Sequence, residues 1–121
     1  MWTNPITVVE TLTFKRQADG VWDDDEREGF IDFIARNPEA GDVIKDGAGV
    51  RKVRWGRAGT GKRGGARVIY FFYNLDTPLY LLLVYAKAVR ADISADAKKA
   101  VREFAESIKQ GHRRPAARRK K

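Results

Sequence analysis

Hydrophobic and polar positions follow two different periods along the chain, and the two periods predict both strands and helices. The segment Thr7–Phe14 alternates apolar and polar residues, which is typical of a half-buried strand, and Gln17–Gly20 follows as a turn. The acidic run at 23–26 supplies the capping oxygens and negative charge that a helix N-terminus favours. Much later, apolar residues at helical spacing predict a second helix, beginning at Asp92 or Ser94.

Three more strands are expected between these two helices. Val50–Trp55 alternates, whereas Ala66–Tyr73 and Leu79–Lys87 are apolar on both faces and are joined by a hairpin connection. A strand that is apolar on both faces belongs in the interior of a sheet. The order β–α–β–β–β–α predicts an α+β domain with a mainly antiparallel sheet and flanking helices.

The length of 121 residues fits one domain, which we place at residues 1–111. Residues 112–121 hold six positive charges and no large apolar side chain, so we interpret them as a flexible basic tail. The chain has no cysteine and one histidine, His112, which argues against disulfides, thiolate zinc sites and histidine pairs. No apolar run approaches the length of a membrane span and the first ten residues lack a signal pattern, so we expect a cytoplasmic protein.

The charge is divided unequally along the chain. Residues 1–48 carry a net charge of −6 and residues 49–121 carry +14. No acidic residue lies between Asp46 and Asp76, a stretch that also contains aromatic residues, and this pattern favours a polyanion such as RNA or DNA. The candidates for contacting nucleic acid by charge or by stacking are Arg51, Arg57, Lys62, Arg63, Tyr73 and Tyr85.

The glycine-rich loop at 56–65 resembles a phosphate-binding loop only in part. Arg63 stands where such a loop needs a hydroxyl for magnesium, and a strand rather than a helix follows, so a nucleoside triphosphatase is excluded.

Four cations could converge around one phosphate at the open face of the expected sheet. Lys52 and Arg54 share one face of their strand, Arg67 opens the next strand, and Lys87 ends the following one, with Tyr85 on the same face. Arginine grips phosphate oxygens and lysine can exchange a proton, so this set suits metal-free RNA cleavage by the ribose 2′-hydroxyl. Strand cations are more often merely solvated, but Arg67 opens an otherwise buried strand, where an unpaired charge is costly.

Three stretches resemble the RelE/HigB superfamily of toxins from bacterial type II toxin–antitoxin modules, and most closely its HigB-like branch. They are NPEAGDVIKDGAGVRKVRW, GKRGGARVIYFFY and YLLLVYAK, in the family's order and spacing over residues 5–109. The resemblance implies a sheet flanked by helices on one side. It also implies a ribosome-dependent mRNA endoribonuclease that inhibits translation and needs no metal or other cofactor.

The resemblance places the family's phosphate-gripping and acid–base cations on Lys52, Arg54, Arg67 and Lys87. Two positions depart from the family pattern. Ala88 stands where some relatives have an arginine, and Ser94 where some have a tyrosine, which leaves Lys87 or Tyr85 as the general acid.

The resemblance further implies an antitoxin of the helix-turn-helix type, contact with operator DNA only through that antitoxin, the ribosome and mRNA as partners, and no membrane. Two alternatives stay open on the residues alone. One is a non-catalytic nucleic-acid-binding module, and the other is an inactive partner of a helix-turn-helix protein.

Overall fold

The computed structural model describes residues 5–56, 65–89 and 92–113, with the backbone alone at 112 and 113. Within these ranges the elements are β1 (Val8–Glu10), α1 (Leu12–Val21), α2 (Asp24–Arg36), β2 (Asp42–Val43), β3 (Val50–Trp55), β4 (Ala66–Phe71), β5 (Leu79–Ala86) and α3 (Ala95–Arg113). The fold is α+β, as predicted. The last helix runs two residues past the domain boundary expected at 111, and residues 114–121 of the predicted tail lie outside the described residues.

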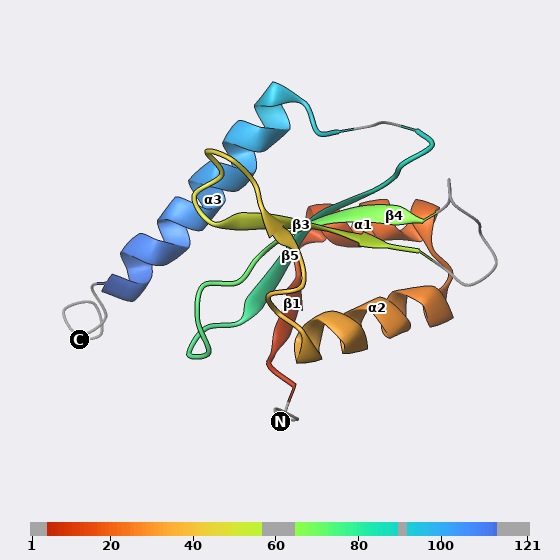
Figure 1. Ribbon diagram of the computed structural model, residues 1–121, viewed down its shortest axis with the longest axis horizontal. Coiled ribbons are helices and arrows are strands. Elements are labelled where there is room, and N and C mark those ends of the chain that lie inside the picture. Colours follow the sequence, from red (N-terminus) through yellow and green to blue (C-terminus); the bar gives the residue numbers. More distant parts are fainter. Residues whose placement is uncertain (1–4, 57–64, 90–91, 114–121) are drawn as a thin grey trace.

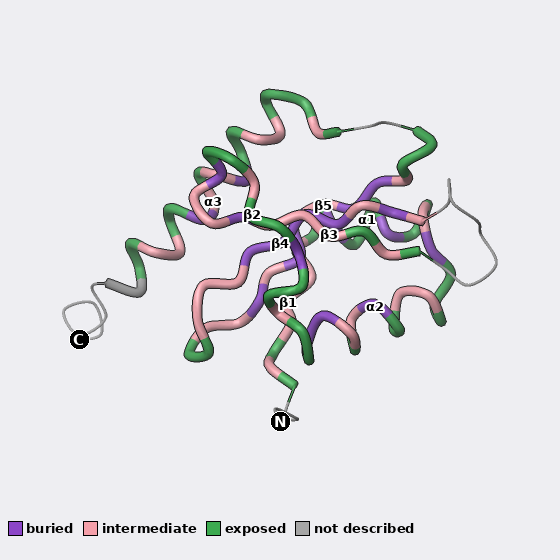
Figure 2. Tube along the Cα trace, in the orientation of Figure 1, coloured by how far each residue is buried: buried purple, intermediate pink, exposed green. Residues whose placement is uncertain are grey.

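The strands form a single sheet in the order β1-β5-β4-β3-β2. Only β1 and β5 are parallel neighbours; the other pairs are antiparallel. Helices α1 and α2 pack on one face and α3 on the other (Figure 1). The expectation of helices on one side of the sheet is therefore wrong. Strands β4 and β5 are interior strands, and the burial-coloured trace shows buried residues along both (Figure 2).

The predicted strand Thr7–Phe14 is wrong beyond Glu10, and α1 takes the place of its second half and of the expected turn at Gln17–Gly20. Thr11 is the N-cap of α1, and its hydroxyl accepts a hydrogen bond from Phe14 N at 3.3 Å. Phe14 and Ala18 lie one helical turn apart and are both buried, so a helix buries this stretch better than a strand. The two-residue β2 was also missed, and the observed order is β–α–α–β–β–β–β–α.

Helix α1 covers the part of β5 that β1 is too short to pair. The β1 pairing ends at Leu81, whose carbonyl accepts hydrogen bonds from Thr11 N at 3.2 Å and Thr11 Oγ1 at 2.8 Å. Farther along β5, Val84 N donates to Gln17 Oε1 at 3.0 Å. Thr11 and Gln17 thus make hydrogen bonds to backbone groups of β5 that a longer β1 would otherwise pair.

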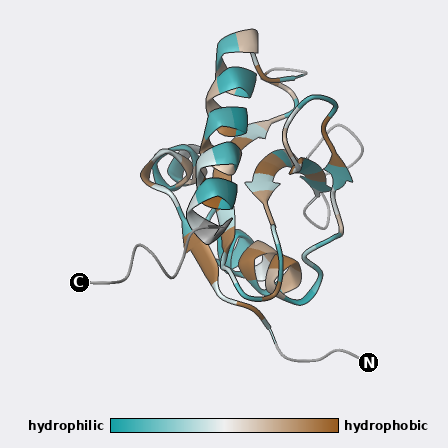
Figure 3. Cartoon of the chain, turned by 90° about the vertical axis from the view of Figure 1, so that its left-hand side faces the viewer, coloured by the Kyte–Doolittle hydropathy of each residue, from teal (hydrophilic) through white to brown (hydrophobic). Residues whose placement is uncertain are grey.

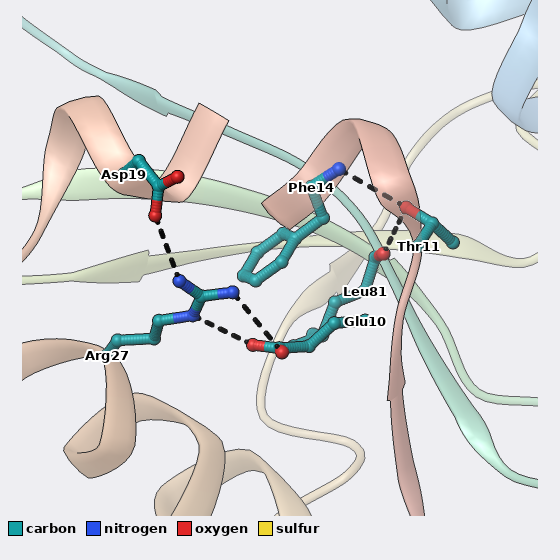
Figure 4. Close-up of polar contacts among 6 residues, drawn as sticks. All are labelled: Glu10, Thr11, Phe14, Asp19, Arg27 and Leu81. Atoms are coloured by element: carbon teal, nitrogen blue, oxygen red, sulfur yellow. Dashed lines mark hydrogen bonds and ion pairs between the residues drawn. The ribbon is translucent and has the colours of Figure 1, made fainter. Parts of the chain in front are cut away.

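Arg27 of α2 ties three elements together (Figure 4). Its guanidinium makes two hydrogen bonds to the Glu10 carboxylate, at 3.0 and 3.3 Å, and a third to Asp19 at 3.3 Å. The hydrogen bond that Arg27 donates to Glu10 raises the pKa of Arg27 above its ordinary value, against a smaller effect of burial. The bidentate pair therefore holds α2 against β1 and the end of α1.

Tyr70 fixes which way the side chains of β4 point. Its hydroxyl accepts a hydrogen bond from Gly41 N at 2.8 Å and donates one to Pro38 O at 2.9 Å, on the face of α1 and α2. Gly41 has to be a glycine, since a Cβ there would lie 2.8 Å from Lys52 O and 2.9 Å from the Tyr70 ring. Because strand residues alternate, Arg67 then points to the opposite face.

We expect Tyr70→Phe to lower the free energy of unfolding by about 1–3 kcal/mol, because the buried Gly41 N–H loses its acceptor. Urea denaturation followed by circular dichroism measures the change. Tyr80→Phe is the matched control, because the Tyr80 ring packs edge-on against Phe104 and its hydroxyl makes no hydrogen bond within the described residues. Equal losses in the two variants would contradict the role given to the Tyr70 hydroxyl.

Stability should also fall at high pH through Tyr70. Burial raises the pKa of its phenol above the ordinary 10.0, and this outweighs the opposing hydrogen bond from Gly41. Above about pH 10 the unfolded chain therefore binds fewer protons than the native one at this residue, and stability is lost as the pH rises. The free energy of unfolding, measured from pH 8 to 11, should fall more steeply in the native sequence than in Tyr70→Phe. Parallel curves would refute this.

Candidate functional site

Arg54, Arg67 and Tyr85 stand in one row across three neighbouring strands. Arg54 of β3 is directly opposite Arg67 of β4, and Arg67 is directly opposite Tyr85 of β5. Residues opposite each other in a sheet share a face, with Cβ atoms about 4.5–5.5 Å apart. The row lies on the α3 face, since Tyr85 belongs to the core beneath α3. The prediction that the strands now labelled β3, β4 and β5 are neighbours is confirmed.

The guanidinium of Arg67 has a buried nitrogen with an unused hydrogen-bonding capacity among the described residues. Its Nη1 atom is buried and makes no hydrogen bond to any described residue. Like charges directly opposite each other destabilise a sheet, and a buried polar group without a partner costs free energy. A bound anion would reduce both the repulsion and the cost of the unpaired nitrogen, because it would lie between the Arg54 and Arg67 charges and accept hydrogen bonds from Arg67.

Lys52 lies on the same face, two residues from Arg54, and it has a carboxylate partner. Lys52 Nζ is 3.5 Å from Asp92 Oδ1, in the segment that leads into α3. The pKa of Asp92 is held below its ordinary 3.8, first by a 2.8 Å hydrogen bond from Ile93 N and then by the Lys52 charge. Asp92 is a site neighbour that sequence reasoning missed. No local signal marks it, because it lies 40 residues from Lys52 and only the fold brings them together.

Lys87 lies in the turn after β5, at the same end of the sheet as Arg67. Its side chain is exposed, and its N–H donates to Gly65 O at 3.5 Å. Gly65 has a φ of +87°, and a Cβ there would lie 2.8 Å from the Gly56 Cα. The two glycines therefore let the end of β3 and the start of β4 approach closely beside the row.

The structure does not bring Arg51 and Tyr73 to this row. Arg51 is on the opposite face, where its guanidinium donates to Gly41 O at 2.7 Å and Glu39 O at 3.3 Å. Tyr73 follows the far end of β4 and stacks on Phe71. The predicted contacts at Arg57, Lys62 and Arg63 lie outside the described residues.

The last helix begins where expected, with Ser94 as its cap. Ser94 Oγ accepts a hydrogen bond from Ala97 N at 3.1 Å. The outward side of α3 is mainly hydrophilic (Figure 3), and its other side packs Val101 and Ala105 onto the sheet. Among the described residues there is no cluster of three or more His, Asp or Glu that could hold a metal. None of the described helices combines the length and apolar character needed to cross a bilayer.

The chain is a small α+β fold with helices on both faces of a mainly antiparallel sheet, and Arg54 and Arg67 stand opposite each other on its α3 face. Residues 11–117 match the family model described as the RelE toxin of the RelE/RelB toxin–antitoxin system, and the chain belongs to this family. The fold is also similar to a free-state structure of the E. coli toxin RelE carrying two arginine-to-alanine substitutions. The TM-score is 0.52 at 11% identity, and the match covers 88% of this chain and 98% of that one. Placement in the HigB-like branch stays a prediction.

We expect Arg67→Met to raise the free energy of unfolding by about 0.5–2 kcal/mol, since it removes an unpaired buried donor and a like-charge pair. Thermal and urea unfolding in low-phosphate buffer measure this. Arg16→Met, at an exposed cation of α1, is the control and should change stability by less than about 0.5 kcal/mol. A loss of more than about 1 kcal/mol at Arg67 would show that the arginine supports the fold instead.

Proposed function

We propose that this chain is the toxin of a type II toxin–antitoxin module and that it cleaves mRNA on the ribosome without a metal. The observation that carries the proposal is the row of Arg54 and Arg67 beside Tyr85, with a buried Arg67 nitrogen that has no hydrogen-bond partner among the described residues. Membership of the RelE toxin family supports the same conclusion.

The cations suit phosphate chemistry in which the RNA supplies its own nucleophile. A base takes the proton of the ribose 2′-hydroxyl, the oxygen attacks the adjacent phosphorus, and the bond to the 5′-oxygen breaks as that oxygen gains a proton. The products are a 2′,3′-cyclic phosphate and a 5′-hydroxyl. Arginines stabilise the extra negative charge on the phosphate oxygens in the transition state.

The positions of the side chains suggest how these roles are divided. Arg54 and Arg67 are side by side and grip the phosphate between them. Lys52 and Lys87 lie on either side of this pair in the fold and exchange protons with the 2′- and 5′-oxygens. Tyr85, the third member of the row, supports Arg67 and stacks against a base or serves as the general acid.

The surroundings of this reaction follow from the same proposal. The ribosome holds the RNA backbone in the geometry for attack, which this face of the sheet does not do alone. The protein therefore works in the cytoplasm, where mRNA is translated. A cognate antitoxin of the helix-turn-helix type neutralises it, and operator DNA is contacted only through that antitoxin.

Induced expression in a bacterial host tests the proposal. The native sequence should arrest growth and produce new mRNA ends, within translated reading frames, that carry 5′-hydroxyls. Arg67→Ala and Lys87→Ala should each reduce cleavage by about 10²- to 10⁴-fold, because each removes a charge or proton-transfer group that acts in the transition state. Sequencing of 5′-hydroxyl ends gives the measurement.

The matched control is Arg16→Ala, which removes an exposed arginine from α1 on the other face of the sheet and should cleave like the native sequence. Circular dichroism of each purified variant establishes that it is folded. Intact messages in cells that accumulate folded native protein would rule out the nuclease and leave a nucleic-acid-binding module. Normal growth with every variant and with the native sequence would point to an inactive antitoxin partner.

A further inference from the structure

We propose that Asp92 is an internal counter-anion of the site: its carboxylate holds Lys52 in the RNA-free toxin and competes with the RNA phosphate for it. The inference rests on the proposed function, because it assigns a regulator to the same phosphate site. It is carried by the contact between Lys52 Nζ and Asp92 Oδ1 at 3.5 Å.

Asp92 distinguishes Lys52 from the other cations of the site. Within the described residues, Arg54, Arg67 and Lys87 form no ion pair, whereas Lys52 does. A carboxylate oxygen and a phosphate oxygen are the same kind of acceptor for an ammonium group, and the two compete for it. In the free protein, Asp92 therefore stands where a phosphate oxygen would contact Lys52.

The contact is weak enough to be exchanged. The Asp92 side chain is 69% exposed and that of Lys52 is 34% exposed, so water and salt screen the pair. Exposed ion pairs of this kind contribute little to stability. An RNA backbone held by Arg54 and Arg67 can therefore displace the carboxylate from Lys52 at small cost.

The carboxylate does not move freely after displacement. Asp92 Oδ1 also accepts the 2.8 Å hydrogen bond from Ile93 N, and Ile93 packs into the core beneath α3. The negative charge is therefore kept near Lys52 when a phosphate arrives, and it opposes binding. Asp92→Asn keeps an oxygen for the Ile93 N–H and removes only the charge.

The test is a double-mutant cycle on RNA binding by the purified full chain. The probe is a short fluorescein-labelled single-stranded RNA with 2′-O-methyl riboses, which cannot be cleaved by 2′-oxygen attack, and the readout is fluorescence anisotropy at low salt. Asp92→Asn should bind about 1.5- to 5-fold more tightly than the native sequence, the range that an exposed ion pair allows. In the Lys52→Ala background, Asp92→Asn should change the affinity by less than about 1.5-fold.

The control is Asp96→Asn, which removes the same charge in the first turn of α3, at an exposed position with no ion pair in the described structure. Three results would overturn the inference while leaving the proposed function intact: no gain in Asp92→Asn, an equal gain in Asp96→Asn, or an equal gain without Lys52. A Lys52→Ala chain that binds the probe as tightly as the native one would overturn both the inference and the role given to Lys52 in the nuclease.

Discussion

The cationic site depends on which face of β4 each residue takes, and the hydrogen bonds of Tyr70 decide this. β4 is apolar on both faces, so hydrophobic burial alone would accept either facing of the strand. Tyr70 has a hydroxyl that needs polar partners when buried, and it finds them at Pro38 and Gly41. With Tyr70 toward α2, Arg67 must lie on the other face, in line with Arg54 and Tyr85. A flip of this strand would bury Arg67 under the α1 and α2 helices.

The sequence predicted correctly those helices and strands that have a clear period of apolar residues or a clear capping signal. The acidic run at 23–26 that caps α2 and the buried strands β4 and β5 were predicted correctly, because each carries a local chemical signal. Helix α1 was misread, because Thr11–Phe14 alternates like a strand over four residues and its helical character depends on packing over β5. The same holds for β2, whose two residues are strand only because they pair with β3.

Some residues of the candidate site could likewise be predicted from the sequence, and others could not. Lys52, Arg54, Arg67, Lys87 and Tyr85 could be grouped from strand alternation and order, and the strand register brings Arg54, Arg67 and Tyr85 into one row. Arg51 has the same charge and is next to Lys52 in the strand. Because adjacent strand residues point to opposite faces, its guanidinium instead donates to the carbonyls of Glu39 and Gly41. Asp92 could not be found, because a contact across 40 residues is a property of the fold and leaves no trace in local composition.

The sheet also separates charge in space. The acid-rich α2, with its Arg27 pair, lies on one face, and the arginine row lies on the other. The molecule therefore has a permanent electric moment directed from the α2 face of the sheet to the α3 face (Figure 1). In the field of a large polyanion, such a moment exerts a torque that turns the cationic face forward while the protein is still diffusing. The productive orientation is thus selected before contact, and the fraction of collisions that begin at the correct face exceeds the fraction that random tumbling would give.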